Sequence, residues 1–146
     1  PSLSQLEILN LENTGITSLG ILALSQSPHI SQLKELNLSN NNLGKKGFRI
    51  LAESKNFKNL VKLRISGVSI GDAGFQTIVQ SNTLNQLEEL EIMGNAISRK
   101  SLDSLLDSKL FSHLKKLDLR RNTLRDVDLI FLADSPKFQI LEALRF

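Results

Sequence analysis

The residues that could do catalytic chemistry are two histidines, His29 and His113, with a serine and an aspartate near the second. Ser112 precedes His113 and Asp118 follows it, so the residue types of a hydrolytic triad are present. Asp118 belongs to a predicted strand that begins after His113, and no third group is placed to orient the imidazole. Neither histidine is followed by a metal-ligand partner at the third or fourth residue. We therefore expect no enzymatic activity, no metal site and no cofactor.

A second set of side chains has the chemistry of protein recognition. It comprises Arg64, Glu91, Met93, Arg120 and Arg121. Arginine and methionine are enriched at protein interfaces, and Met93 is an adaptable apolar side chain predicted to face solvent. The two adjacent arginines have a single aspartate as their local acidic partner. We predict that these five residues form the binding site for a protein partner.

These side chains occupy fixed positions of a sequence repeat. The phrase L-x-x-L-x-L-x-x-N-x-L, clearest at 33–43, starts again every 27 residues. A fixed period of this length indicates a repeat architecture, in which each unit packs only on its neighbours. We number the positions of each unit from 1 to 27. We predict one domain over 1–146, a piece of a longer array, with units at 6–32, 33–59, 60–86, 87–113 and 114–140 and a partial unit at 141–146.

Each unit is predicted to begin with a short strand, because the apolar residues at positions 4 and 6 have the period of two of a half-buried strand. Parallel neighbours would place the position 3 residues side by side, in a row of alternating charge formed by Glu35, Lys62, Glu89 and Lys116. At position 5, Arg64 can meet Glu91 and Asp118 can meet Arg145. Two interpretations of these charges remain open: a self-neutralising ladder of ion pairs and a polar recognition surface.

Position 9 carries an asparagine in three units, Asn41, Asn95 and Asn122. A buried asparagine there can bond the backbone of the bend after the strand, and stacked units would form a ladder of such bonds. Val68 occupies this position in the third unit and cannot make these bonds. We therefore predict a locally altered turn in that unit, or a water in place of the amide.

The second half of each unit is predicted to be a helix, because positions 16, 19 and 20 form one apolar stripe. On the outer side, positions 17 and 18 are polar or mixed in the middle units but are Ile130 and Phe131 in the fifth. Two explanations remain open: contact with sequence outside this chain, and self-association through Ile130 and Phe131. The strands at the two ends also present unpaired edges, so we predict a weak homodimer through the exposed ends.

The repeated phrase begins six times at one spacing and is followed by helical segments such as LGKKGFRILAES (43–54). This pattern resembles leucine-rich repeat proteins. The 27-residue unit with its helical return is similar to the helix-rich subclasses, which include ribonuclease-inhibitor-like repeats and those of F-box and bacterial proteins. This resemblance implies an α/β fold, a right-handed solenoid with a parallel concave sheet and convex helices. It also implies protein recognition without catalysis. The chain departs from the pattern at Val68, at Asp128 and in lacking a recognisable cap.

The composition disfavours several classes of partner and location. The net charge is only +3, and acidic residues interrupt the basic residues of the predicted concave face, which disfavours nucleic acid as a partner. No apolar run reaches the roughly 18 residues of a membrane span. The chain has no cysteine and no signal-peptide pattern, so we expect a cytoplasmic protein. Two functions remain: a protein-binding scaffold, and the target-recognition segment of a larger protein such as a ubiquitin-ligase adaptor or a bacterial effector.

Overall fold

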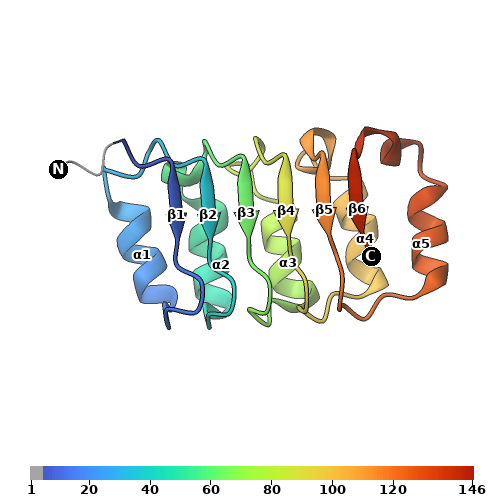
Figure 1. Ribbon diagram of the computed structural model, residues 1–146, viewed down its shortest axis with the longest axis horizontal. Coiled ribbons are helices and arrows are strands. Elements are labelled where there is room, and N and C mark those ends of the chain that lie inside the picture. Colours follow the sequence, from blue (N-terminus) through green and yellow to red (C-terminus); the bar gives the residue numbers. More distant parts are fainter. Residues whose placement is uncertain (1–4) are drawn as a thin grey trace.

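The computed structural model describes residues 5–146, in which six short strands alternate with five α-helices (Figure 1). The strands pair in chain order into one parallel sheet. Adjacent strands are in register by repeat position, with Leu36 opposite Leu63 and Leu63 opposite Leu90. The strands are β1 (Ile8–Asn10), β2 (Glu35–Asn37), β3 (Lys62–Arg64), β4 (Glu89–Glu91), β5 (Lys116–Asp118) and β6 (Ala143–Arg145).

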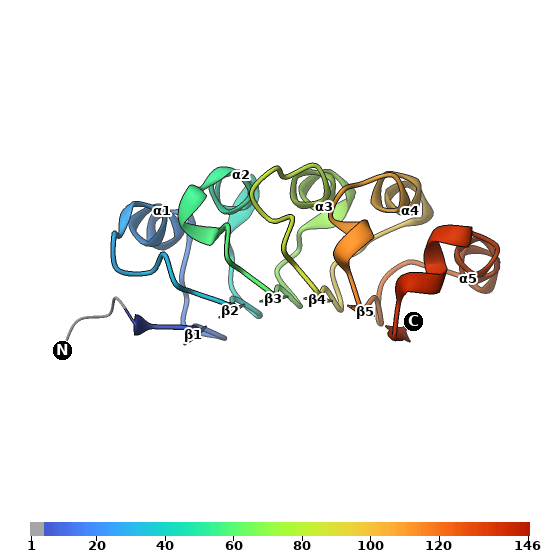
Figure 2. The same ribbon diagram turned by 90° about the horizontal axis from the view of Figure 1, so that it is seen from above.

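All five helices cover the same face of the sheet. Viewed from above, the molecule is a gentle arc with the strands along the inner side and the helices along the outer side (Figure 2). The predicted α/β leucine-rich repeat solenoid, with a concave parallel sheet and convex helices, is confirmed. The helices are α1 (Ser18–Gln26), α2 (Gly44–Glu53), α3 (Gly71–Val79), α4 (Arg99–Leu106) and α5 (Asp126–Ala133), and 3-10 turns lie at η2 (Lys55–Phe57), η3 (Phe111–His113) and η4 (Pro136–Ile140).

The core lies between the sheet and the helices and is built from the repeated leucines. Leu36, Leu63 and Ile65 have no exposed surface. In the end units the equivalent Leu9 and Leu144 are half-buried, because each has a neighbouring unit on one side only. The interior is therefore a row of similar contributions, one per unit.

The first four helices begin in two ways, whereas in α5 the carboxylate of Asp128 accepts the N–H of Arg125, the residue before the helix, at 2.9 Å. In α1 and α4 a hydroxyl caps the first turn: Thr17 Oγ1 accepts the Leu19 N–H, and Ser98 Oγ accepts the Lys100 N–H, each at 3.3 Å. In α2 and α3 the first residue is instead a glycine with positive φ, Gly44 at 59° and Gly71 at 58°. Glycine adopts this conformation without a Cβ clash, so the turn itself replaces the cap.

The position 9 asparagines bond the backbone across unit boundaries. Asn95 Oδ1 accepts the N–H groups of Val68 and Ile70 in the preceding unit, at 3.0 and 3.3 Å. Its Nδ2 donates to the carbonyl oxygens of Ile65 and Ile92, at 2.7 and 3.0 Å. Asn41 and Asn122 repeat this arrangement. Each asparagine thus ties its own strand end to the turn before it.

The turn after Val68 differs from the others in backbone conformation, but the loss of hydrogen bonds on which the prediction rested does not occur there. Ser69 and Gly71 both have positive φ, at 54° and 58°, a combination that no other unit of the described chain has. The missing hydrogen bonds fall elsewhere, however, because each asparagine serves the preceding unit. Within residues 5–146, two turns lack a side-chain acceptor for these N–H groups: that of the second unit, at Asn41 and Leu43, and that of the fifth, at Asn122 and Leu124.

Candidate functional site

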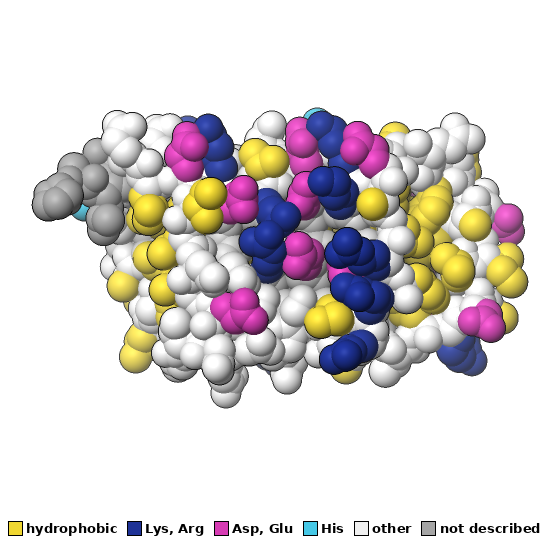
Figure 3. Space-filling model, in the orientation of Figure 1, with side chains coloured by type: hydrophobic (Ala, Val, Ile, Leu, Met, Phe, Trp, Pro, Cys, Tyr) yellow, Lys and Arg dark blue, Asp and Glu magenta, His cyan; other side chains and the backbone are white. Residues whose placement is uncertain are grey.

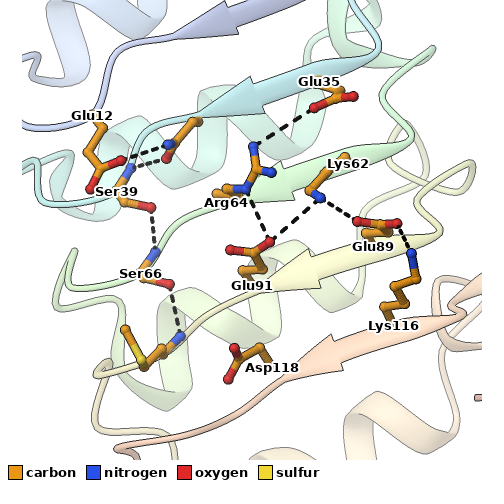
Figure 4. Close-up of polar contacts among 12 residues, drawn as sticks. Glu12, Glu35, Ser39, Lys62, Arg64, Ser66, Glu89, Glu91, Lys116 and Asp118 are labelled. Atoms are coloured by element: carbon orange, nitrogen blue, oxygen red, sulfur yellow. Dashed lines mark hydrogen bonds and ion pairs between the residues drawn. The ribbon is translucent and has the colours of Figure 1, made fainter. Parts of the chain in front are cut away.

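Charged side chains at position 3 form a ladder of ion pairs across the concave face (Figure 4). Glu89 lies between two lysines, with its carboxylate oxygens 2.5 Å from Lys62 Nζ and 2.6 Å from Lys116 Nζ. The hydrogen bonds from Lys116 and Lys62 hold the pKa of Glu89 below its usual value. The predicted side-by-side row is confirmed by the strand register.

Arg64 and Glu91, two of the predicted site residues, belong to the same network at position 5. Arg64 Nε lies 3.1 Å from Glu91 Oε1, and Arg64 Nη1 lies 3.9 Å from Glu35 Oε2. Both side chains keep about a third of their surface exposed, at 30% and 33%. Ion pairs at this exposure contribute only about 0–1 kcal/mol each. Their main effect is to fix the position of charges on the surface.

Arg120, another predicted site residue, is held by Asp118. Its Nε lies 2.9 Å and its Nη2 2.6 Å from the two carboxylate oxygens. The hydrogen bond from Arg120 keeps the pKa of Asp118 below its usual value, and the same bond raises the pKa of Arg120. Arg145 Nη1 reaches this carboxylate at 3.7 Å. Two guanidinium groups therefore share one carboxylate at the β5–β6 end of the sheet.

Arg121 is the predicted site residue whose charge the fold leaves unmatched. It is exposed and sits in the turn after β5 with a φ of 56°. Within the described chain, no carboxylate lies within ion-pair distance of its guanidinium. In the space-filling view, basic side chains gather in a column over β5 (Figure 3).

A shallow groove crosses the carboxyl ends of the strands and contains Arg64, Glu91, Met93 and Arg121. We call it the strand-end groove. The structure thus brings four of the five predicted residues together, whereas Arg120 is not part of the lining.

The position 7 serines on the groove floor and the acid at its far end were not among the site residues predicted from sequence. Ser39 Oγ accepts the Ser66 N–H, and Ser66 Oγ accepts the Met93 N–H, each at 3.2 Å (Figure 4). At the end opposite Arg121, the two carboxylate oxygens of Glu12 accept from the amides of Asn37 and Asn40 at 3.0 and 3.2 Å. The run of small residues at positions 7 and 8 in the third unit was the signal for this groove.

The residues with catalytic potential do not assemble into a triad. Ser112 Oγ lies 3.1 Å from His113 Nδ1, as their adjacency allows. The carboxylate of Asp118 is bonded to arginine side chains instead of the imidazole. Across residues 5–146, no three histidine, aspartate or glutamate side chains are grouped to hold a metal ion.

The outer face of α5 differs from the prediction in one respect. Ile130 is 59% exposed, as predicted, but Phe131 is half-buried. Arg99 of α4 covers its ring, with Cζ 3.5 Å from the ring centroid. Phe131 is therefore a contact between α4 and α5. The exposed apolar surface instead combines Ile130 with Val127, at 55% exposure.

Comparison with known proteins agrees with this architecture. The sequence model of the PRAME C-terminal domain family matches residues 3–130. This chain belongs to the PRAME C-terminal domain family. No curated protein matches the chain. Among solved structures, it is similar to an internalin (inlF) from Listeria monocytogenes str. 4b F2365, with a TM-score of 0.65 and 19% identity over 99% of this chain and 36% of the internalin chain. At this identity the likeness shows the fold alone.

The PRAME C-terminal domain family match and the internalin fold confirm the leucine-rich repeat resemblance. Such repeat arrays are typically non-enzymatic scaffolds for protein interaction. The matched segment contains the whole strand-end groove, from Glu12 to Arg121. Phe131, η4 and β6 lie beyond it. No helix within residues 5–146 is long and apolar enough to cross a membrane.

Proposed function

We propose that this member of the PRAME C-terminal domain family is a non-catalytic scaffold that binds a protein partner through its concave face. The observation that carries the proposal is the strand-end groove, where Met93 and Arg121 lie on a face whose other charges are mostly paired. Met93 offers an adaptable apolar contact and Arg121 an unpaired cation. Both are suited to contact an incoming surface without first breaking a contact within the chain.

The remaining three site residues have supporting roles in this proposal. Arg64 and Glu91 line the groove as a preformed pair, so a partner can bind across them without paying for their ordering. Arg120 is fixed by Asp118 and adds positive potential beside Arg121. Arrays of short parallel strands are rigid, which suits a surface that recognises by shape and charge.

A pull-down with the intact protein tests the proposal. The bait is compared with the double variant Met93→Ala/Arg121→Glu and with Arg49→Glu, a matched charge reversal on the exposed convex face of α2. We expect a protein retained by the wild type and by Arg49→Glu but lost from the double variant. Circular dichroism of all three baits checks that each is folded.

Recovery of the same proteins by all three folded baits would contradict binding at this face. Recovery of nucleic acid alone would contradict a protein partner. In either case the concave scaffold proposal fails while the fold stands.

A second candidate function is a target-recognition segment whose activity lies elsewhere in a larger protein, such as a ubiquitin-ligase adaptor or a bacterial effector. The observation that favours it is that the matching family is described as a C-terminal domain, and that this chain spans 36% of the internalin it resembles. The two candidate functions differ in whether the captured partner is chemically modified. If the captured partner is ubiquitinated or cleaved when the full-length protein is present and not when this chain alone is present, the second candidate is correct.

A further inference from the structure

The strand-end groove has opposite charges at its two ends, and each lacks a partner of opposite sign. Glu12 lies at the β1 end, where its oxygens are held by the side-chain amides of Asn37 and Asn40. Arg121 lies at the β5 end. Within residues 5–146, neither Glu12 nor Arg121 is within ion-pair distance of an oppositely charged side chain.

The charges near the two ends reinforce this polarity. Over β2 the charged concave residue is Glu35, which reaches Arg64 only at 3.9 Å. Beside Arg121, two arginines, Arg120 and Arg145, share the single carboxylate of Asp118. The groove is therefore acidic at its β1 end and basic at its β5 end, with matched pairs between.

The middle of the groove offers few groups that could contact a bound segment. Ser66 Oγ accepts the Met93 N–H, and within the described chain its own proton has no acceptor. That hydroxyl is free to donate to a main-chain carbonyl of a bound segment. Position 8 is glycine in the third and fourth units, Gly67 and Gly94. The side chain of Asn40 lies over Gly67, whereas the space above Gly94 is open. Met93 supplies the one apolar contact.

We infer that the strand-end groove binds an extended segment of a protein partner, with a side-chain carboxylate on Arg121, an apolar side chain on Met93 and a basic residue toward Glu12. This inference rests on the proposed function and adds the chemistry and direction of the bound segment. Five strands at about 4.8 Å spacing span about 19 Å, and an extended chain rises about 3.3 Å per residue. The segment in contact is therefore about six residues long.

A single strand of nucleic acid also has an extended, negatively charged backbone. Glu12 and Glu91 both line the groove, however, and would repel the phosphates that lie beside them. Among the lining residues there is no aromatic platform on which bases could stack. The charge pattern therefore favours a segment whose charge changes sign along its length.

Panning a display library of random twelve-residue peptides on the intact chain tests the inference. Enriched sequences are synthesised with acetylated and amidated ends, so that only side-chain charges count, and titrated by fluorescence anisotropy. We expect an acid and a large apolar residue close together, with a basic residue further along. Arg121→Glu should weaken binding about tenfold and Glu12→Lys several-fold, because each reversal replaces attraction by repulsion. Arg49→Glu, on the convex face, should leave affinity unchanged.

The outcomes separate this inference from the proposed function. Peptides that lack acids, or that bind Arg121→Glu as tightly as the wild type, overturn the polarity; if they still lose affinity to Met93→Ala, the concave site itself stands. Failure to enrich any peptide overturns the extended segment, while the pull-down still tests the scaffold. Tighter binding of a labelled oligouridine, with a steep dependence on salt, would replace the peptide by nucleic acid.

Discussion

At the scale of single residues, Asn95 is the most buried of three asparagine side chains that each bond five backbone groups. Its amide bonds the N–H groups of Val68 and Ile70 and three carbonyl oxygens at the ends of β3 and β4. It is 1% exposed, so water cannot replace it. The sequence predicted this ladder from the repeated asparagine, but not its direction. The asparagine could have served its own turn, and only the stacking of the units decides that it serves the turn before.

Asn95→Ala should therefore lower the free energy of unfolding by about 3 kcal/mol or more, because several buried donors and acceptors lose their partner together. Thr14→Ala removes the exposed residue at the same position of the first unit and should cost less than about 1 kcal/mol. Urea denaturation of both variants measures the difference. Equal losses would show that the ladder carries no special stability.

Glu89 gives a pH dependence whose sign follows from its lysine partners. Its pKa is lowered in the folded chain from the value of 4.5 expected without them. The folded state therefore gains stability from the ionised carboxylate above about pH 4.5, and this gain is lost as the pH falls through the lower, folded pKa. Glu89→Gln should be less stable than wild type at neutral pH by about 1 kcal/mol.

The difference between the two proteins should shrink as the pH is lowered below about 4.5. Thermal unfolding midpoints from pH 7 to pH 2 measure it. A difference that stays constant over this range would mean that the ladder contributes nothing through charge.

At the scale of elements, the start of α4 is held by the start of α3. Asp72 Oδ1 accepts the Ser98 N–H at 2.8 Å, and Oδ2 accepts the Ser98 hydroxyl at 2.6 Å. Ser101 donates to the same carboxylate at 2.5 Å. Burial raises the pKa of Asp72, but the hydrogen bonds from Ser101 and Ser98 outweigh it and the net pKa is lowered. Asp72 therefore lies in the first turn of α3 and also links α3 to α4.

Asp72→Ala should destabilise the chain by about 2 kcal/mol and open the first turn of α4 before the rest. Asp103→Ala, an exposed carboxylate on α4 itself, should change stability by less than about 0.5 kcal/mol. Hydrogen exchange of the amides of Ser98 to Ser101 measures the local opening. Unchanged protection in Asp72→Ala would contradict the link between the helices.

Elements were predictable where the repeat alone decides them. The strand register follows from the constant spacing, and Glu35, Lys62, Glu89 and Lys116 are neighbours for that reason. The contacts of the Arg120 and Phe131 side chains could not be predicted, because each depends on which neighbour a long side chain reaches. Arg120 turns back to Asp118, and Arg99 crosses from α4 to cover Phe131. The strand-end groove emerges only when the small residues of several units are stacked.

At the scale of the whole molecule, the convex face carries large apolar side chains at both ends and not in the middle. Position 14 is Lys46, Ala73 and Lys100 in α2, α3 and α4 but Leu19 in α1 and Val127 in α5, and all five are exposed. In the middle helices this position stays exposed although units flank both sides. A further repeat stacked on α5 would therefore leave Val127 uncovered, and the patch that it forms with Ile130 is better suited to contact between molecules.

We predict weak self-association through this patch. The weight-average sedimentation coefficient should rise as the concentration reaches hundreds of micromolar, and Val127→Lys/Ile130→Asp should suppress the rise. Lys46→Ala/Arg49→Ala, at the same positions of α2, serves as the matched control and should behave as the wild type. A wild-type protein that stays monomeric over this range, or a rise that survives the α5 substitutions, would contradict the prediction.

The most direct test of the concave scaffold is to map where the captured partner binds. At 16.3 kDa the chain is small enough for residue-by-residue NMR, so the amide shifts can be followed as unlabelled partner is added. We expect the largest changes at Ser39, Ser66, Met93 and Arg121, with the convex helices unaffected. Changes confined to the outer faces of α1 to α5, with the groove amides unmoved, would contradict it.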